Sequence, residues 1–294
     1  MAILGVDLGG TKIAAGLVSA KAEVTHCREV PTLADQGYEV SRGQLDQLIA
    51  AMLGPEVEAI GICAPGPLDP ISGVVANPPN LPGWRNIALA HETARKYGLP
   101  CRVENDANAA ALAEARFGAG AGFDPVFYAT LSTGIGTGLV SGGKVFHGAH
   151  GAAAEGGHVS VDYRSSVVCR CGVRGCIEAL ASGTAILRRA REAGFSVQNA
   201  SELAALEDPA AVQLMEETTD MLAAWLGSMM TLFDPGVVVL GGGVTKLGEK
   251  LFGPLRRKTP ACTLNPNAAG ISIVPAALGR ECGVVGAAAA FLSF

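Results

Sequence analysis

Three cysteines and one histidine stand close together in the sequence, and side chains of these types bind metal ions. The segment from Cys169 to Cys176 holds the cysteines, and Gly172 and Gly175 would permit the tight turn that brings the last thiol back to the others. Thiolate sulfur binds Zn²⁺ at about 2.3 Å and imidazole nitrogen at about 2.1 Å, so this set would complete a tetrahedron around a structural ion. The predicted zinc ligands are His158, Cys169, Cys171 and Cys176. The spacing differs from that of a paired C-x₂-C ribbon, so a redox cluster or a chance arrangement remains the alternative.

A glycine-rich turn near the start of the chain has the composition of a phosphate-binding loop. Residues 3–7 and 13–18 are predicted to be buried strands, and residues 9–12 between them read Gly-Gly-Thr-Lys. Glycine lets backbone N–H groups approach phosphate oxygens, while the threonine and lysine add a hydroxyl group and a positive charge. The turn leads into a strand and no Walker A motif occurs, which excludes P-loop and Rossmann geometry. Taken alone, the turn could also be an ordinary β-hairpin.

Two similar turns follow predicted strands later in the chain. Residues 132–138 read Ser-Thr-Gly-Ile-Gly-Thr-Gly after a strand at residues 126–131, and residues 241–243 are three glycines after a strand at residues 237–240. Three glycine turns at strand ends would suit one nucleotide that lies across a cleft between two lobes. The repeat of strand, glycine turn and strand in each half also indicates an internally duplicated, two-lobed protein.

Asp106 is the carboxylate best suited to catalysis. It follows a predicted strand, residues 101–105, and precedes a predicted alanine-rich helix at about residues 107–117. An aspartate at a helix start is commonly a cap. The positive end of the helix dipole would also keep this carboxylate ionised at neutral pH, as a base that accepts a hydroxyl proton requires. Phosphoryl transfer needs chiefly alignment of the attacking hydroxyl and neutralisation of charge, so one such carboxylate would suffice.

A proline-rich segment, residues 77–84, is predicted to be a stiff extended loop that presents the Asn80 amide, with Trp84 as an apolar anchor. Together with other polar side chains, it offers the donors and acceptors that a polyhydroxyl ligand requires. The candidate sugar-binding residues are Asn80, Asn105, Asp106, Glu155, His158 and Glu178. Each of them taken alone could instead belong to a surface turn or a helix cap.

The composition is that of a compact α/β enzyme. The chain has 294 residues, of which 49% are hydrophobic and 17% charged. Its net charge of −5 and its lack of Lys- or Arg-rich clusters argue against nucleic acid as a partner. Residues 1–7 lack the basic segment of a signal peptide, and no apolar stretch approaches the ~20 residues of a membrane span, so we expect no membrane association. The cysteines outside the metal motif are scattered, as expected for reduced thiols in the cytoplasm.

Two lobes are predicted from the turns that divide the chain. A glycine-rich break at residues 118–125 separates them. The small α/β lobe would comprise residues 1–118 plus 283–294, and within the latter segment residues 283–292 are expected to form a helix of small residues that packs back on this lobe. The large α/β lobe would comprise residues 119–282, which carry the metal motif. A long amphipathic helix in the large lobe is predicted to end before Asp234 and Pro235.

Together these motifs resemble those of the ROK family (repressor, open reading frame, kinase), and within it most closely the bacterial ATP-dependent glucokinases. The cysteine motif with the upstream Glu-x-Gly-His is specific to that family. The matching segments run nearly end to end and are residues 7–12, 65–69, 77–84, 104–108, 132–138, 155–158, 169–178 and 240–243. The resemblance implies an actin-like ATPase fold of the hexokinase type, which is ribonuclease H-like, with two α/β lobes around an interlobe cleft. It also implies a homodimer or homotetramer.

The resemblance implies a role for each matching residue. Asp106 would be the catalytic base that accepts the proton of the sugar 6-hydroxyl, and Asp7 would help to organise Mg²⁺ through water. The remaining sugar hydroxyls would be held by Asn80, Asn105, Glu155, His158 and Glu178. The phosphates of ATP would be contacted by Gly9, Gly10, Thr11 and Lys12 from one side and by Thr133 and Gly134 from the other, with Gly242 near the adenosine. Structural zinc would fix the geometry of the sugar site.

Three positions depart from the family pattern. Ala154 and Gly156 flank Glu155 where the family more often has glycine and a bulky aliphatic residue, which would alter the pocket near C1 and C2 of the sugar. Thr137 replaces a common glycine in the second glycine turn, and we expect little consequence of that replacement.

The predicted function is ATP-dependent phosphorylation of a hexose at the 6-hydroxyl, with D-glucose favoured. Fructose, mannose, allose, N-acetylmannosamine and N-acetylglucosamine remain alternatives, as do phosphoryl donors other than ATP. Two rivals of another class are an actin-like ATPase that needs no sugar and a sugar-sensing regulator of the DNA-binding branch. Residues 105–108 and the metal motif count against the first, and Asp7 comes too early in the sequence for the winged helix of the second.

Overall fold

The computed structural model describes residues 2–292, which form two compact α/β units. Unit 1 comprises residues 2–118, 144–153 and 278–292. Unit 2 comprises residues 119–143 and 154–277. The sequence predicted residues 144–153 and 278–282 to belong to the large lobe, whereas the structure places them in unit 1. These residues pack within unit 1 because His147 contacts Glu104 at 2.7 Å and the backbone N–H of Leu278 donates to Glu114 at 2.9 Å.

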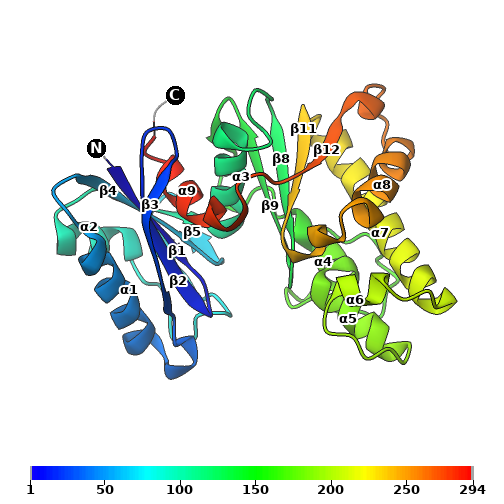
Figure 1. The fold of residues 1–294 in the computed structure, drawn as a ribbon, viewed down its shortest axis with the longest axis horizontal. Coiled ribbons are helices and arrows are strands. Elements are labelled where there is room, and N and C mark those ends of the chain that lie inside the picture. The colour runs from blue at the N-terminus through cyan, green and yellow to red at the C-terminus, as the bar shows by residue number, and fades with distance from the viewer. Residues whose placement is uncertain (1, 293–294) are drawn as a thin grey trace. The chain divides into compact units, whose positions relative to one another are not determined.

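The main sheet of unit 1 combines three antiparallel strands with two further parallel strands (Figure 1). Its strands are β1 (Ala2–Leu8), β2 (Lys12–Val18), β3 (Val24–Pro31), β4 (Val57–Ala64) and β7 (Cys101–Asn105), in the order β3-β2-β1-β4-β7. Strand β2 pairs with β1 in antiparallel fashion, whereas β4 is parallel to both β1 and β7. Two short strands, β5 (Leu68–Asp69) and β6 (Val74–Val75), form a separate hairpin, and β10 (Lys144–Val145) belongs to the later segment of this unit.

Unit 2 repeats this plan. Its strands are β8 (Val126–Leu131), β9 (Ile135–Ser141), β11 (Val237–Gly241) and β12 (Ser272–Pro275). The pair β8–β9 is an antiparallel hairpin, and β11 is parallel to both β8 and β12. The repeat of strand, glycine turn and strand that the sequence predicts therefore corresponds to β1–β2 in one unit and β8–β9 in the other.

Helices cover both faces of the sheet in unit 1 (Figure 1). They are α1 (Tyr38–Met52), α2 (Leu89–Tyr97), α3 (Asp106–Phe117) and α9 (Cys282–Ala289). Because side chains alternate along a strand, Leu4 and Val6 pack in the core that includes α1, while Ile3 packs in the one that includes Val284 of α9. Helix α9, which the sequence placed on the small lobe, belongs to unit 1.

Glycines on the sheet allow α9 to approach it closely. A Cβ atom on Gly5 would overlap the carbonyl oxygen of Val284, and one on Gly61 would overlap that of Ala287. Any larger residue at these positions would push the helix away from β1 and β4.

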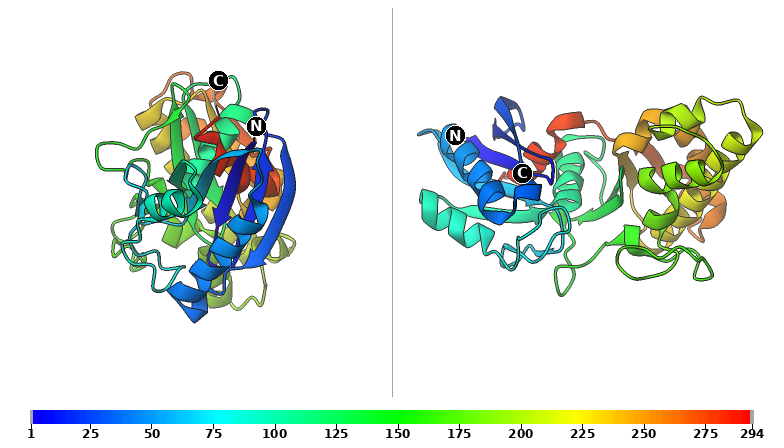
Figure 2. Two further views of the ribbon diagram at one scale, coloured as in Figure 1. Left: turned by 90° about the vertical axis from the view of Figure 1, so that its left-hand side faces the viewer. Right: turned by 90° about the horizontal axis from the view of Figure 1, so that it is seen from below.

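The helices of unit 2 gather against its sheet (Figure 2). They are α4 (Ile177–Ala181), α5 (Gly183–Glu192), α6 (Ala200–Ala204), α7 (Pro209–Phe233) and α8 (Glu249–Lys258). The long helix α7 begins after the Asp208 cap and buries Trp225, Leu226 and Met229 against the sheet, as its apolar periodicity predicts. Among residues 2–292, no helix is both long and apolar enough to span a bilayer.

Candidate functional site

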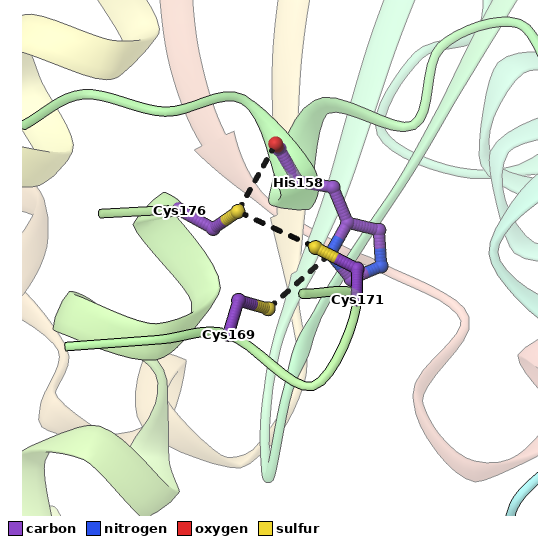
Figure 3. A group of neighbouring side chains, drawn as sticks. All are labelled: His158, Cys169, Cys171 and Cys176. Carbon is purple, nitrogen blue, oxygen red and sulfur yellow. Dashed lines mark hydrogen bonds between the residues drawn. The ribbon is translucent and has the colours of Figure 1, made fainter. Parts of the chain in front are cut away.

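The predicted metal ligands lie together in unit 2 (Figure 3). One donor atom from each of His158, Cys169, Cys171 and Cys176 lies within 4.8 Å of all the others. The Cys169 Sγ atom lies 3.6 Å from His158 Nδ1, and the Sγ atoms of Cys171 and Cys176 are also 3.6 Å apart. In a tetrahedron with Zn–S bonds of about 2.3 Å, the sulfur atoms are about 3.8 Å apart. The spacing and the chemistry of these donors therefore fit zinc.

Local backbone geometry brings the cysteines together. Gly172 and Gly175 have φ values of +89° and +68°, in the left-handed region that glycine adopts without strain. The N–H of Gly172 donates to the Cys169 carbonyl at 2.9 Å, which closes a turn that contains both Cys169 and Cys171. Cys176 lies directly before α4, and its Sγ is 3.2 Å from the carbonyl oxygen of His158 (Figure 3). The turn that the sequence predicts is confirmed.

Glu178 connects this cluster to the second glycine turn. It lies in the first turn of α4, and its Oε2 accepts a hydrogen bond from the backbone N–H of Ile135 at 3.0 Å. Its Oε1 is 3.8 Å from the Cys169 Sγ atom. A Cβ atom on Gly134 would lie only 2.5 Å from Oε2, so the turn needs glycine at this position for the carboxylate to approach.

The glycine turn after β11, residues 241–243, lies beside the glycine turn after β8, residues 132–134. Strands β8 and β11 are parallel neighbours, so the turns after them meet at one edge of the sheet, where α/β folds bind ligands. Gly242 has a φ of +90°, and a Cβ atom there would overlap the Leu131 carbonyl oxygen. Gly183, at the start of α5, donates its N–H to the Ser132 carbonyl at 2.7 Å. Gly183 is not among the residues predicted from the sequence, although a glycine directly after the Ser182 helix cap can indicate a close approach of another segment.

Glu155 is exposed, and Thr137 contacts the residues on both sides of it. The Thr137 hydroxyl donates to the Ala154 carbonyl and accepts from the Gly156 N–H. The Thr137 side chain therefore turns toward the Glu155 segment, a contact that the sequence did not indicate. Desolvation raises the pKa of the Glu155 carboxyl group, while the nearby His158 lowers it.

In unit 1, three adjacent parallel strands end in residues that could do chemistry. Register places Asp7 of β1 beside Cys63 of β4, and Ala64 beside Asn105 of β7. Burial raises the pKa of Asp7, and a hydrogen bond from the Cys63 thiol at 3.4 Å opposes that shift. The carboxyl ends of parallel strands are the usual ligand edge of such sheets.

Asp106 is the exposed first residue of α3. The cap is Asn105, whose Oδ1 accepts from the N–H groups of Ala107 at 2.9 Å and Asn108 at 3.3 Å. Asp106 Oδ1 accepts from the Ala107 N–H at 2.7 Å, which orients the carboxylate at the positive end of the helix. Asn105, and not Asp106, is therefore the residue that caps the helix. Its side-chain oxygen is used in capping, so its amide nitrogen is the group suited to donating to a ligand.

The first glycine turn lies against the Asn80 loop. A Cβ atom on Gly10 would lie 2.6 Å from the Asn80 carbonyl oxygen, so the turn and the loop are in close contact. Trp84 is buried and donates from Nε1 to Ser41 at 2.8 Å, which confirms its predicted role as the anchor of this loop. Thr11 is exposed, and the Lys12 ammonium group forms an ion pair of 2.6 Å with Glu29 on β3.

One contact in unit 1 gave no signal in the sequence. His147 Nε2 lies 2.7 Å from Glu104 Oε2, and the other oxygen of Glu104 accepts from the Asn105 N–H at 2.9 Å. The bond to Glu104 raises the pKa of His147. His147 and Glu104 are 43 positions apart, and only the return of residues 144–153 to this unit brings them together.

Comparison with known proteins assigns the chain to one family. A sequence profile described as "ROK family" matches residues 3–293. The chain belongs to the ROK family. A glucokinase of Thermotoga maritima is 36% identical over 305 residues, which covers 97% of this chain and 96% of that protein. An N-acetylmannosamine kinase of Shigella flexneri is 35% identical over 290 residues, covering 98% and 97%.

A solved ROK family structure is also similar over nearly its whole length. The ROK family glucokinase of Streptomyces griseus, determined in complex with glucose and AMPPNP, is 36% identical with a TM-score of 0.82, covering 98% of each chain. The predicted fold class, an α/β ROK sugar-kinase fold built from two units, is confirmed. The resemblance found in the sequence is likewise confirmed.

Proposed function

We propose that this ROK family member transfers the γ-phosphate of ATP to the 6-hydroxyl of a hexose, and that the hexose is D-glucose. The observation that carries the proposal is the exposed Asp106 carboxylate at the start of α3, beside the strand ends that bear Asp7 and Asn105. A carboxylate at the positive end of a helix is suited to accept a hydroxyl proton as that oxygen attacks phosphorus. The similarity to glucokinases over nearly the whole chain supports the choice of reaction and sugar.

The remaining roles follow from the same proposal. Asp106 accepts the proton of the 6-hydroxyl, and Asp7 helps to organise Mg²⁺, which neutralises charge on the phosphates when bound. The other sugar hydroxyls are held by Asn80, Asn105, Glu155, His158 and Glu178. The phosphates of ATP lie against Gly9, Gly10, Thr11 and Lys12 of unit 1 and against Thr133 and Gly134 of unit 2, with Gly242 near the adenosine. For Lys12 this requires that its exposed ion pair with Glu29 opens, which costs little for such a pair.

The metal cluster has a structural role in this proposal. When bound, zinc holds His158 and the turn before α4 in place. Glu178 follows the last ligand on the first turn of that helix, so the cluster positions a sugar-binding carboxylate.

The decisive experiment is a coupled assay of ADP release over a panel of hexoses. ATP consumption that depends on glucose is the expected result, and ATPase activity indifferent to every sugar would overturn the proposal in favour of an actin-like ATPase. Polyphosphate in place of ATP tests the donor. N-acetylmannosamine belongs in the panel as the second candidate substrate, because the N-acetylmannosamine kinase matches this chain at 35% identity over nearly its full length.

We further propose that the protein works in the cytoplasm as a homodimer or homotetramer without nucleic acid or membrane partners. Light scattering on the purified protein tests the assembly. A mass equal to one chain at micromolar concentration would contradict it.

A further inference from the structure

Thr137 is a buried residue of β9 whose hydroxyl group has two backbone partners. The hydroxyl accepts from the Gly156 N–H at 2.7 Å and donates to the Ala154 carbonyl oxygen. The side chain as a whole is 5% exposed, so water has little access to compete for these bonds. A single hydroxyl donates one hydrogen and accepts others, and here both functions are used.

These two partners are the residues on either side of Glu155. The Gly156 N–H also bonds to the Ala154 carbonyl at 2.8 Å, and Glu155 has φ −73° and ψ 55°. This is an inverse γ-turn with Glu155 at its centre. Thr137 bridges the same N–H and the same carbonyl, so it closes the turn a second time.

The turn is anchored further in the core of unit 2. Trp225 is buried and donates from Nε1 to the Gly156 carbonyl at 3.0 Å. Ala154 has a φ of +60°, an unusual value for a residue with a Cβ atom, which persists when surrounding contacts hold it. The backbone around Glu155 is therefore held from both sides, while its own side chain is exposed.

Gly156 makes room for this arrangement. A Cβ atom there would lie 3.1 Å from Thr137 Oγ1 and 3.4 Å from Met229 Sδ. The Cβ position of residue 156 therefore faces the core. Because glycine has no side chain, Thr137 and Met229 occupy the space there. A threonine on β9 and a glycine after Glu155 therefore complement each other in volume.

We infer that Thr137 is a positioning residue for the sugar, because its hydroxyl group holds the turn that presents the Glu155 carboxylate. This inference rests on the proposed role of Glu155 in binding the hexose. Thr137 acts through the Ala154 and Gly156 backbone, and no contact of its own with the sugar is required.

The test compares Thr137→Val, which keeps the shape and removes the hydroxyl, with Thr137→Ser, which keeps the hydroxyl. Loss of buried hydrogen bonds should raise KM for glucose about tenfold in Thr137→Val, with KM for ATP within about twofold of wild type. Thr137→Ser should restore KM for glucose to within about twofold of wild type. Calorimetric titration with glucose in the absence of nucleotide should likewise show weaker binding to Thr137→Val than to Thr137→Ser and wild type.

A matched control removes another buried hydroxyl of the same unit. Thr218 on α7 is buried and donates to the Leu214 carbonyl at 2.8 Å, within its own helix. Thr218→Val should leave KM for glucose unchanged even if it lowers the unfolding temperature. An equal rise of KM in Thr218→Val and Thr137→Val would overturn the inference, because the effect would then be one of stability alone.

A double-mutant cycle covers the case in which Thr137→Val does not fold. Gly156→Ala should raise KM for glucose when Thr137 is present and add nothing further in a Thr137→Gly background, where the contact is gone. Additive effects would overturn the inference. A wild-type protein that phosphorylates no hexose would overturn the proposed function and this inference with it. A wild-type kinase whose Thr137→Val variant keeps the wild-type KM would overturn this inference alone.

Discussion

The Glu178 carboxylate accepts a hydrogen bond from the backbone N–H of Ile135 at 3.0 Å. This contact joins the first turn of α4, directly after the metal cluster, to the glycine turn between β8 and β9. Glu178, which is proposed to bind the sugar, therefore also holds the glycine turn that is proposed to bind the phosphates. Changes at Glu178 should therefore affect both substrates.

Glu178→Ala should raise KM for ATP as well as KM for the sugar. A hydrogen bond to a charged group contributes about 1.5–3 kcal/mol, which corresponds to roughly 10- to 100-fold in affinity when it is lost. Glu178→Gln keeps an oxygen acceptor for the Ile135 N–H and should retain most of the affinity for ATP. Steady-state kinetics with each substrate varied in turn measure this. An ATP KM that stays at the wild-type value in Glu178→Ala would contradict the predicted link.

Asp106→Asn should lower kcat by roughly 10²- to 10⁴-fold, the usual contribution of general-base catalysis. Glucose affinity should change little, since asparagine can still accept from the Ala107 N–H. Kinetics and glucose titration together test this. The matched control is Asp208→Asn at the cap of α7, where asparagine caps as well as aspartate, so kcat should stay at the wild-type value. Near-normal turnover in Asp106→Asn would rule out its role as the base.

Purified protein should contain about one zinc ion per chain, and Cys176→Ser should reduce that content. Cys176 is buried, and its loss leaves an incomplete ligand set, so we expect the unfolding temperature to fall by at least about 5 °C and KM for the sugar to rise. Elemental analysis and thermal unfolding measure the two effects. Cys262→Ser, at an exposed cysteine outside the cluster, should keep both the metal and the stability. Freshly purified protein without any metal would refute the site.

The ion pair between His147 and Glu104 should make stability depend on pH. The bond to Glu104 raises the folded-state pKa of His147 above its ordinary value of 6.5, and Asp69 adds to the shift. The stabilisation is therefore fully present below about pH 6.5 and is lost as pH rises through the raised pKa. His147 is partly exposed, so the effect should be at most about 1 kcal/mol.

Urea unfolding of His147→Gln and wild type at about pH 6 and about pH 9 measures this difference. The variant should be less stable than wild type at the lower pH and closer to it at the higher pH. His91→Gln, at an exposed histidine of α2, serves as the control and should show no such trend. A gap between His147→Gln and wild type that widens toward high pH would contradict the assignment.

Much of the fold could be predicted because the signals are local. The strand at Val126–Leu131 and the helix that ends at Phe233 follow from apolar periodicity together with Gly, Asp and Pro at their ends. The exact bounds depend on more than that: the sequence places the last helix through residue 292, whereas α9 ends at Ala289. Capping shows the same limit, since Asp106 and Asn105 are both good caps and only the backbone conformation selects Asn105.

The chemical types and the local turns could be predicted from the sequence: three cysteines around two glycines, a carboxylate before a helix, and glycines after strands. These features depend on neighbours within a few residues, so spacing alone constrains them. Which distant groups meet depends on how the elements pack in three dimensions. Glu178 and Ile135 are 43 positions apart, and Thr137 lies 19 positions from Gly156. A hydrogen bond needs its two atoms within about 3 Å, and strand pairing and helix packing set that distance, which no local pattern specifies.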